Sequence, residues 1–192
     1  MAVKDYDVIV IGASTGGPKA IEKVLKEFPE DLGVAILIVQ HMPKGFTKSF
    51  AERLNKCCKI EVLEANDGMR IEKNKVYIAP GGYHMEVVKG EKIQLNDEAT
   101  IWGVRPAVDK LFISISKVFK EKIISVILTG MGKDGAKGID TIKSVGGTTI
   151  SQDEKSCIIY GMPKVAYETG AIDYVLPLDE IALKIKSLLN KL

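Results

Sequence analysis

Short apolar runs alternate with stretches of helical periodicity along most of this 192-residue chain. The runs VIVIG at 8–12, VAILIV at 34–39 and IISVILT at 123–129 contain almost no polar residues. Strands buried on both faces of a parallel sheet have this pattern, whereas half-exposed strands alternate between apolar and polar residues. These three runs therefore predict the central strands of a sheet that is covered on both sides.

Stretches of helical spacing separate the apolar runs. Pro18 favours a helix start, and Ile21, Val24 and Leu25 follow it on one helical face. Similar patterns cover 46–54, 104–119, the residues after 138 and the amphipathic segment 178–189. Strands that alternate with helices predict an α/β fold, doubly wound, with a largely parallel sheet and helices on both faces.

The region from 60 to 95 differs from the rest of the chain. It contains four short strand-like runs, at 60–65, 75–80, 83–88 and 91–95. The short sequences NDG, PGG and KG separate these runs, and glycine-containing sequences of this kind are typical of turns and hairpins. We therefore expect a small antiparallel or mixed section, including a hairpin, at the edge of the main sheet.

Composition excludes several classes of function. The net charge is +2, which gives no electrostatic case for binding nucleic acid or an acidic membrane surface. The apolar runs are too short for a signal peptide or a membrane span. The three cysteines lack the spacing of a disulfide framework or a zinc site. These features predict a soluble, cytoplasmic protein with no metal, no cofactor and no membrane insertion.

Three reactive side chains follow the three strongest predicted strands. Ser14 comes after 8–12, His41 after 34–39, and Asp134 after 123–129. Side chains at the carboxyl ends of parallel strands meet at one edge of the sheet, where ligands bind in open α/β folds. A hydroxyl, an imidazole and a carboxylate are the groups needed for nucleophilic acyl transfer.

The sequence around Ser14 allows more than one interpretation. GASTG fits the G-x-S-x-G nucleophile elbow, in which glycines permit a sharp turn that exposes the serine. Alternatively, Ser14 or Thr15 caps the following helix, or the glycine turn holds a phosphate at the helix start. The phosphate interpretation is weaker, because neither G-x-G-x-x-G nor G-x-x-x-x-G-K-[ST] is present.

The base and the carboxylate differ in how well the residues define them. The chain has two histidines, and His84 lies inside a hairpin-like run, which favours a structural role. His41 lies at a strand end and is the better candidate for a general base. Asp134 lies in a tight glycine-rich loop, where an aspartate serves equally well as a helix N-cap. From spacing alone these two roles of Asp134 stay equally supported.

Six segments in sequence order resemble the catalytic domain of the bacterial chemotaxis protein-glutamate methylesterases, the CheB-type family. They are GASTGGP, VQHMPKGFTKSFAERL, YIAPGGYHM, RPAVDKLF, ILTGMGKDGAKG and QDEKSCIIYGMP. The resemblance implies a serine hydrolase that demethylates glutamate methyl esters on methyl-accepting chemotaxis receptors, with receptor glutamine deamidation as a further activity. It assigns Ser14 as nucleophile, His41 as general base and Asp134 as the orienting carboxylate. It also assigns the backbone N–H of Met131 to the oxyanion hole.

The resemblance also frames regulation and substrate contact. Family members usually carry an N-terminal receiver domain that responds to a phosphorelay kinase. Here the first strand begins near residue 8, which predicts a single catalytic domain over residues 1–192 without a receiver domain. Loops near 43–48, 80–84 and 101–106 are candidate walls of a substrate cleft, with Thr15 and Arg105 as candidate substrate contacts. Two alternatives stay open: a hydrolase of this type that acts on a small ester or on another protein, and a nucleotide or phosphate binder that uses the turn at 12–17.

Overall fold

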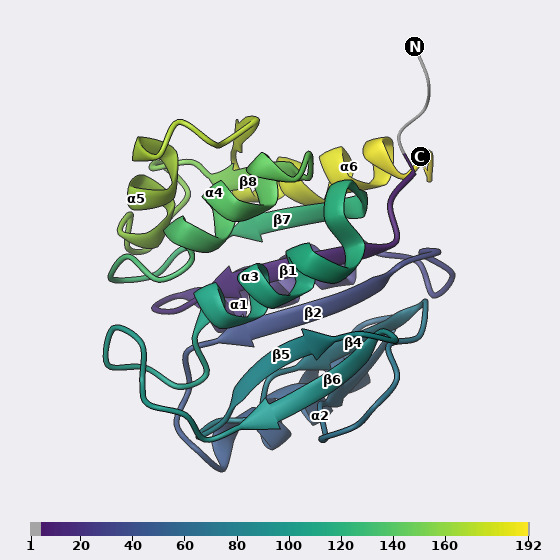
Figure 1. Ribbon diagram of the computed structural model, residues 1–192. Coiled ribbons are helices and arrows are strands. Elements are labelled where there is room, and N and C mark those ends of the chain that lie inside the picture. Colours follow the sequence, from purple (N-terminus) through teal and green to yellow (C-terminus); the bar gives the residue numbers. More distant parts are fainter. Residues whose placement is uncertain (1–4, 192) are drawn as a thin grey trace.

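A seven-stranded sheet crosses the centre of the protein in the computed structural model, which describes residues 5–191 (Figure 1). Its strand order is β3-β4-β2-β1-β7-β8-β9, and each neighbouring pair is parallel. The strands are β1 (Val8–Ala13), β2 (Ala35–Gln40), β3 (Glu61–Glu64), β4 (Lys75–Ile78), β7 (Ile123–Ile127), β8 (Thr148–Gln152) and β9 (Tyr174–Leu176). A separate antiparallel hairpin pairs β5 (His84–Val88) with β6 (Lys92–Asn96).

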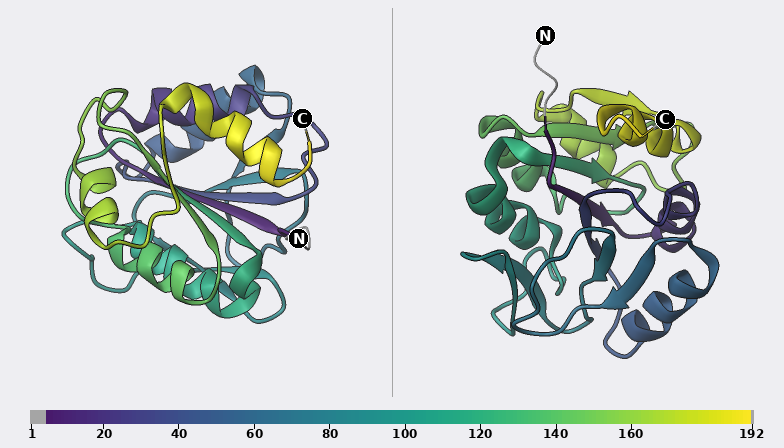
Figure 2. Two further views of the ribbon diagram at one scale, coloured as in Figure 1. Left: turned by 90° about the horizontal axis from the view of Figure 1, so that it is seen from above. Right: turned by 90° about the vertical axis from the view of Figure 1, so that its right-hand side faces the viewer.

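Helices cover both faces of this sheet (Figure 2). On one face lie α1 (Gly17–Lys26), α2 (Phe46–Cys57) and α6 (Leu178–Leu188). On the other lie α3 (Val108–Phe119), α4 (Ala136–Ser144) and α5 (Met162–Glu168), together with the β5-β6 hairpin. The short 3-10 helix η1 (Lys120–Lys122) connects α3 to β7. The predicted fold, doubly wound and with helices on both faces, is confirmed.

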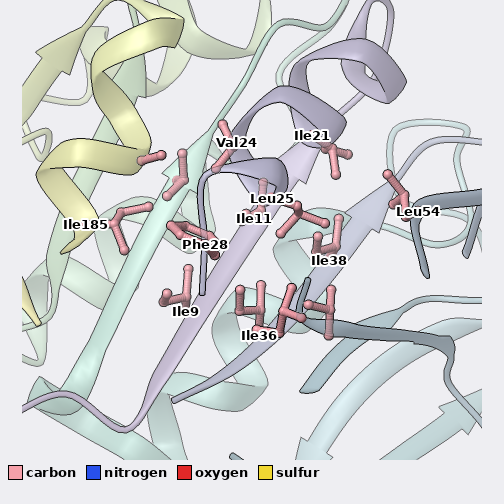
Figure 3. Packing of buried hydrophobic residues seen from close by; sticks show 14 of the residues in the cluster. Ile9, Ile11, Ile21, Val24, Leu25, Phe28, Ile36, Ile38, Leu54 and Ile185 are labelled. Atoms are coloured by element: carbon pink, nitrogen blue, oxygen red, sulfur yellow. The ribbon is translucent and has the colours of Figure 1, made fainter. Parts of the chain in front are cut away.

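Side chains on the two faces of each central strand belong to two separate hydrophobic clusters. Ile9 and Ile11 of β1 pack with α1 and α6 on one side, as Figure 3 shows for this cluster. Val8 and Val10, which point to the opposite face, pack in the cluster that contains α3. Burying each such side chain contributes roughly 1.5–3 kcal/mol. Two-sided burial is therefore the reason that the central strands lack polar residues.

The predicted section between 60 and 95 is partly wrong. The runs at 60–65 and 75–80 form β3 and β4, which are parallel strands of the main sheet. Only the hairpin β5-β6 forms the separate antiparallel unit that turn signals predicted. β3 and β4 join the main sheet because β4 continues it beside β2 and because Val62 and Val76 pack under α2.

The strand order reverses direction at β1, which has β2 on one side and β7 on the other. The chain leaves β1 into α1 on one face, and leaves β7 toward α4 on the opposite face. Open α/β sheets bind ligands in the crevice at such a switch point. Residues that follow β1, β2 and β7 thus lie at the edge where a ligand is expected. Within residues 5–191, no helix is both long enough and apolar enough to span a bilayer.

Candidate active site

Ser14 lies immediately after β1, in the turn that leads into α1. Its backbone N–H donates to the carbonyl of Thr129 beyond β7 at 3.0 Å, and its own carbonyl accepts from Gly17 N–H at 2.8 Å. The side chain is half-buried rather than packed into the core. The turn is thus fixed through its backbone while the hydroxyl stays accessible.

Neither Ser14 nor Thr15 caps α1 with its side chain. α1 begins at Gly17, its N-cap residue is Gly16 with φ 81°, and no side chain makes a capping hydrogen bond. Glycine suits this position because other residues rarely adopt positive φ. Thr15 is exposed beside Ser14. Neither hydroxyl is used to start the helix, so both remain available for a ligand.

His41 and Asp134 are in direct contact. The Nε2 atom of His41 lies 2.7 Å from Oδ2 of Asp134, and both side chains are largely shielded from solvent. The carboxylate favours a proton on Nε2, which leaves the Nδ1 lone pair as the basic atom. The backbone N–H of His41 donates to the carbonyl of Ala13 at 3.0 Å. This bond holds the histidine beside the residue that precedes Ser14.

Asp134 also caps a helix, but not the helix predicted from the sequence. Its Oδ2 accepts the N–H of Val108 at 2.6 Å and its Oδ1 accepts that of Asp109 at 2.9 Å, at the start of α3. Asp109 in turn accepts the N–H groups of Gly135 and Gly138 at the start of α4, at 3.0 and 2.8 Å. The two carboxylates thus cap each other's helices, and this exchange fixes the carboxylate that contacts His41.

Asp109 carries its carboxylate in a buried environment. Burial raises the pKa of Asp109, and the nearby charge of Asp134 adds to this effect. The N–H donors of Gly138 and Gly135 and the indole N–H of Trp102 oppose the rise. Asp109 does not contact His41, so we assign it to positioning the loop of Asp134.

The glycine-rich loop after β7 lies against Ser14. A Cβ atom on Gly130 would lie 2.8 Å from the Ser14 Cβ, so glycine is required for this approach. Met131 follows with its side chain 67% exposed. Within residues 5–191 its backbone N–H donates to no acceptor. This unpaired N–H in the loop against Ser14 is a candidate oxyanion donor, and its role stays a prediction.

Comparison with known proteins decides the family. The sequence profile described as CheB methylesterase matches residues 9–185 of the chain. The chain belongs to the CheB methylesterase family.

Relatives and a solved structure agree with this family assignment. The protein-glutamate methylesterase/protein-glutamine glutaminase of Clostridium acetobutylicum is 60% identical over 176 residues, covering 92% of this chain and 51% of the relative. The protein of the same name from Pyrococcus horikoshii is 54% identical, covering 90% and 48%. The crystal structure of the Thermotoga maritima CheB methylesterase catalytic domain has a TM-score of 0.92 at 43% identity, covering 96% of this chain and 99% of that one. This chain thus spans about half the length of these curated relatives.

The CheB-family segment QDEKSCIIYGMP has a supporting role that sequence reasoning missed. The hydroxyl of Thr129 accepts the N–H groups of Ile158 and Ile159, at 3.1 and 3.0 Å, and donates to the carbonyl of Thr15 at 2.9 Å. One buried hydroxyl therefore ties this segment to the turn of Ser14. Its position at the end of β7 was the available signal, but its partners are distant in sequence.

Gln40, the last residue of β2, holds the serine and histidine turns together. Its Nε2 donates to the carbonyl of Ser14 at 2.9 Å and to that of His41 at 3.0 Å. The side chain is buried, with only 2% exposed. A single amide thus fixes the spacing between the turns that carry the candidate nucleophile and the candidate base.

We expect Gln40→Leu to lower kcat roughly 10- to 100-fold, because displacement of reacting groups by about 1 Å has effects of this size. The variant leaves two partly buried carbonyls without this donor, so the unfolding free energy should fall by about 1–3 kcal/mol. Esterase kinetics and thermal unfolding measure both effects. Gln94→Leu, on the exposed face of β6, is the matched control. Equal kcat values for the two variants would contradict the role of Gln40.

Arg105 lies in the wall of a hollow beside His41. The hollow has a volume of about 290 Å³ and is lined by His41, Met42, Pro43, Gly103, Val104, Arg105 and Pro106. The Nη1 atom of Arg105 donates to the carbonyls of Asp97 and Glu98, at 2.5 and 2.8 Å. Arg105 therefore braces the loop that forms one side of the hollow, and its contact with substrate stays a prediction.

His84 is packed in the interior, in β5 of the hairpin. Its Nδ1 accepts the N–H of Ala107 at 3.2 Å, and its Nε2 faces the carbonyl of Ala99 at 3.0 Å. Both ring nitrogens are occupied by backbone partners that hold the loop before α3. These hydrogen bonds support a structural role for His84.

Proposed function

We propose that this chain is the catalytic domain of a protein-glutamate methylesterase. Its substrates are glutamate methyl esters on methyl-accepting chemotaxis receptors, and its products are glutamate and methanol. The observation that carries this proposal is the His41–Asp134 contact beside the Ser14 turn in a CheB-family fold. The names of the similar proteins support the choice of substrate.

The His41–Asp134 hydrogen bond beside the Ser14 turn supports a two-step acyl transfer. Ser14 Oγ attacks the ester carbonyl while His41 Nδ1 accepts its proton, and Asp134 stabilises the imidazolium that forms. The oxyanion of the tetrahedral intermediate accepts a hydrogen bond from Met131 N–H. His41 then protonates the departing methoxide, which leaves as methanol. Water attacks the acyl-enzyme by the same route and releases the glutamate.

The same residues support deamidation of receptor glutamines. An amide carbonyl forms the same tetrahedral intermediate, and His41 protonates the departing nitrogen to release ammonia. No step in either reaction requires a cofactor. The printed names of the curated relatives include a glutaminase activity, which supports this second reaction.

The biological setting is part of the proposal. We place the chain in the cytoplasm, because its apolar runs are too short for a signal peptide or a membrane span, and we expect it to act on a protein and not on nucleic acid or inside the bilayer. If it belongs to a longer protein, a receiver domain and a phosphorelay kinase are its expected regulators. The chain spans about half the length of its curated relatives.

Labelling with a serine-directed fluorophosphonate tests the nucleophile without assuming a substrate. We expect one modified peptide, containing Ser14, and loss of methanol release from methylated receptor in proportion to labelling. An activated serine reacts because its hydroxyl is deprotonated by a neighbouring base. Heat-unfolded protein is the control and should not be labelled. Full labelling at another serine, or inhibition without label on Ser14, would refute the assignment.

A further inference from the structure

Trp102 occupies a backbone conformation that disfavours tryptophan. It is the tip of a tight turn in which Ile101 and Val104 exchange both backbone hydrogen bonds, at 3.1 and 3.0 Å. The two central residues, Trp102 and Gly103, both have positive φ, 54° and 77°. Turns of this kind favour asparagine, aspartate or glycine, and a bulky residue there is strained. Such strain persists where a side chain serves a purpose other than folding.

Core packing does not explain the tryptophan. Its side chain is 55% exposed. The indole N–H donates to Oδ2 of Asp109 at 3.2 Å, and Nζ of Lys133 lies 3.9 Å from the ring centroid. The contacts that hold the ring are thus made by two polar groups, the Asp109 carboxylate and the Lys133 ammonium.

These partners place the ring at the rim of the candidate active site. Lys133 lies between Met131 and Asp134 in the loop that faces Ser14. The residues after Trp102 line the hollow that contains His41. Met131 and Ile158 add further exposed apolar side chains, and Ile158 packs close to Gly16 in the Ser14 turn. An aromatic ring and a cation thus lie next to the hollow that contains His41.

We propose that Trp102 is a specificity-determining residue that contacts the receptor segment next to the methylated glutamate. The inference rests on the proposed function. The methylated glutamate belongs to a polypeptide, so the residues next to it extend over this rim, where the indole face can contact apolar atoms and the Lys133 ammonium can contact carboxylates. A small methyl ester fills only the reacting centre and does not extend to this rim. Trp102 therefore favours the protein substrate over small esters.

The expected effect is a change in substrate preference. Exposed aromatic residues that become buried on binding are frequent hot spots, and their removal commonly weakens binding about tenfold or more. We expect the ratio of kcat/KM for methylated receptor to kcat/KM for a small glutamate γ-methyl ester to fall by about this factor when the ring is removed. The change should arise mainly in KM for the receptor, because Trp102 does not touch the reacting atoms.

The sharpest test compares Trp102→Asn and Trp102→Phe with the wild-type protein. Asparagine relieves the positive-φ strain, whereas loss of the indole N–H to Asp109 opposes this gain, so Trp102→Asn should unfold within a few degrees of wild type while its specificity ratio falls. Phenylalanine keeps an aromatic face but loses the N–H donor to Asp109, so Trp102→Phe should keep most of the ratio. A fall in Tm for Trp102→Asn together with an unchanged ratio would show a purely structural residue.

Two failures are distinguishable in this experiment. If wild-type protein hydrolyses the small ester but releases no methanol from methylated receptor, the proposed substrate is wrong and the inference that rests on it is overturned. If wild-type protein demethylates the receptor and Trp102→Asn retains the same ratio, the inference is overturned and the proposed function stands. A lowered ratio with kcat/KM for the small ester retained supports both, and a lowered ratio that comes from loss of small-ester activity overturns the inference.

Discussion

Ser14→Ala is expected to lower methanol release from a methylated receptor by at least about 10⁴-fold, the range seen when the nucleophile of a triad is removed. The alanine keeps the Cβ that faces Gly130 and removes only the hydroxyl, so the turn should retain its backbone hydrogen bonds. Initial rates, together with thermal unfolding, measure the two effects separately. We expect the unfolding temperature to stay within about 2 °C of wild type, since a surface-accessible hydroxyl contributes little to stability.

Ser144→Ala is the matched control for this variant. Ser144 is an exposed serine at the end of α4, so its replacement should leave the rate unchanged. A folded Ser14→Ala protein that still releases methanol at the wild-type rate would exclude Ser14 as the nucleophile. It would also direct attention to another mode of ester hydrolysis in the same cleft.

Asp134→Asn is expected to reduce both activity and stability. The activity should fall by about 10⁴-fold, because an amide cannot hold His41 in the required tautomer. The carboxylate also accepts three hydrogen bonds, from His41, Val108 and Asp109. An asparagine presents an N–H₂ group in place of one oxygen, so at least one buried donor loses its acceptor. The unfolding free energy should therefore fall by about 1–3 kcal/mol.

Asp140→Asn, on the exposed face of α4, is the control for the charge change and should alter neither quantity. Combining Asp134→Asn with Ser14→Ala should give an activity no lower than that of Ser14→Ala alone, since triad residues act as a unit. Full activity in Asp134→Asn would show that His41 does not depend on this carboxylate. Unchanged stability would show that the cap of α3 is dispensable.

The fold was predictable where burial alone determines the sequence. The apolar runs of β1, β2 and β7 identify buried parallel strands because both faces exclude polar residues. β3 and β4 were placed wrongly because they are short, four residues each, and turn signals surround them. Local turn signals do not reveal that β4 pairs with β2, since the partner is distant in the chain.

The candidate site was predictable as a set of residues but not as a geometry. Ser14, His41 and Asp134 could be placed at one sheet edge because each follows a central strand. The ring orientation of His41 depends on Oδ2 of Asp134, which is 93 positions away in sequence. The clamp by Gln40 and the hydroxyl contacts of Thr129 likewise join distant segments, so no local pattern indicates them.

Asp134 caps the start of α3, and Asp109 of α3 caps the start of α4, so the two helix starts depend on each other. Two carboxylates accept the four backbone N–H groups at these helix starts: Asp134 accepts those of Val108 and Asp109, and Asp109 accepts those of Gly135 and Gly138. Each carboxylate therefore lies on the segment that the other one caps. A local opening that frees one helix start removes the acceptor of the other, so these amides should exchange with solvent together. The same opening releases His41 from Asp134. Loss of the proposed activity on heating is therefore coupled to a subglobal fluctuation at the two helix starts, below the free energy of global unfolding.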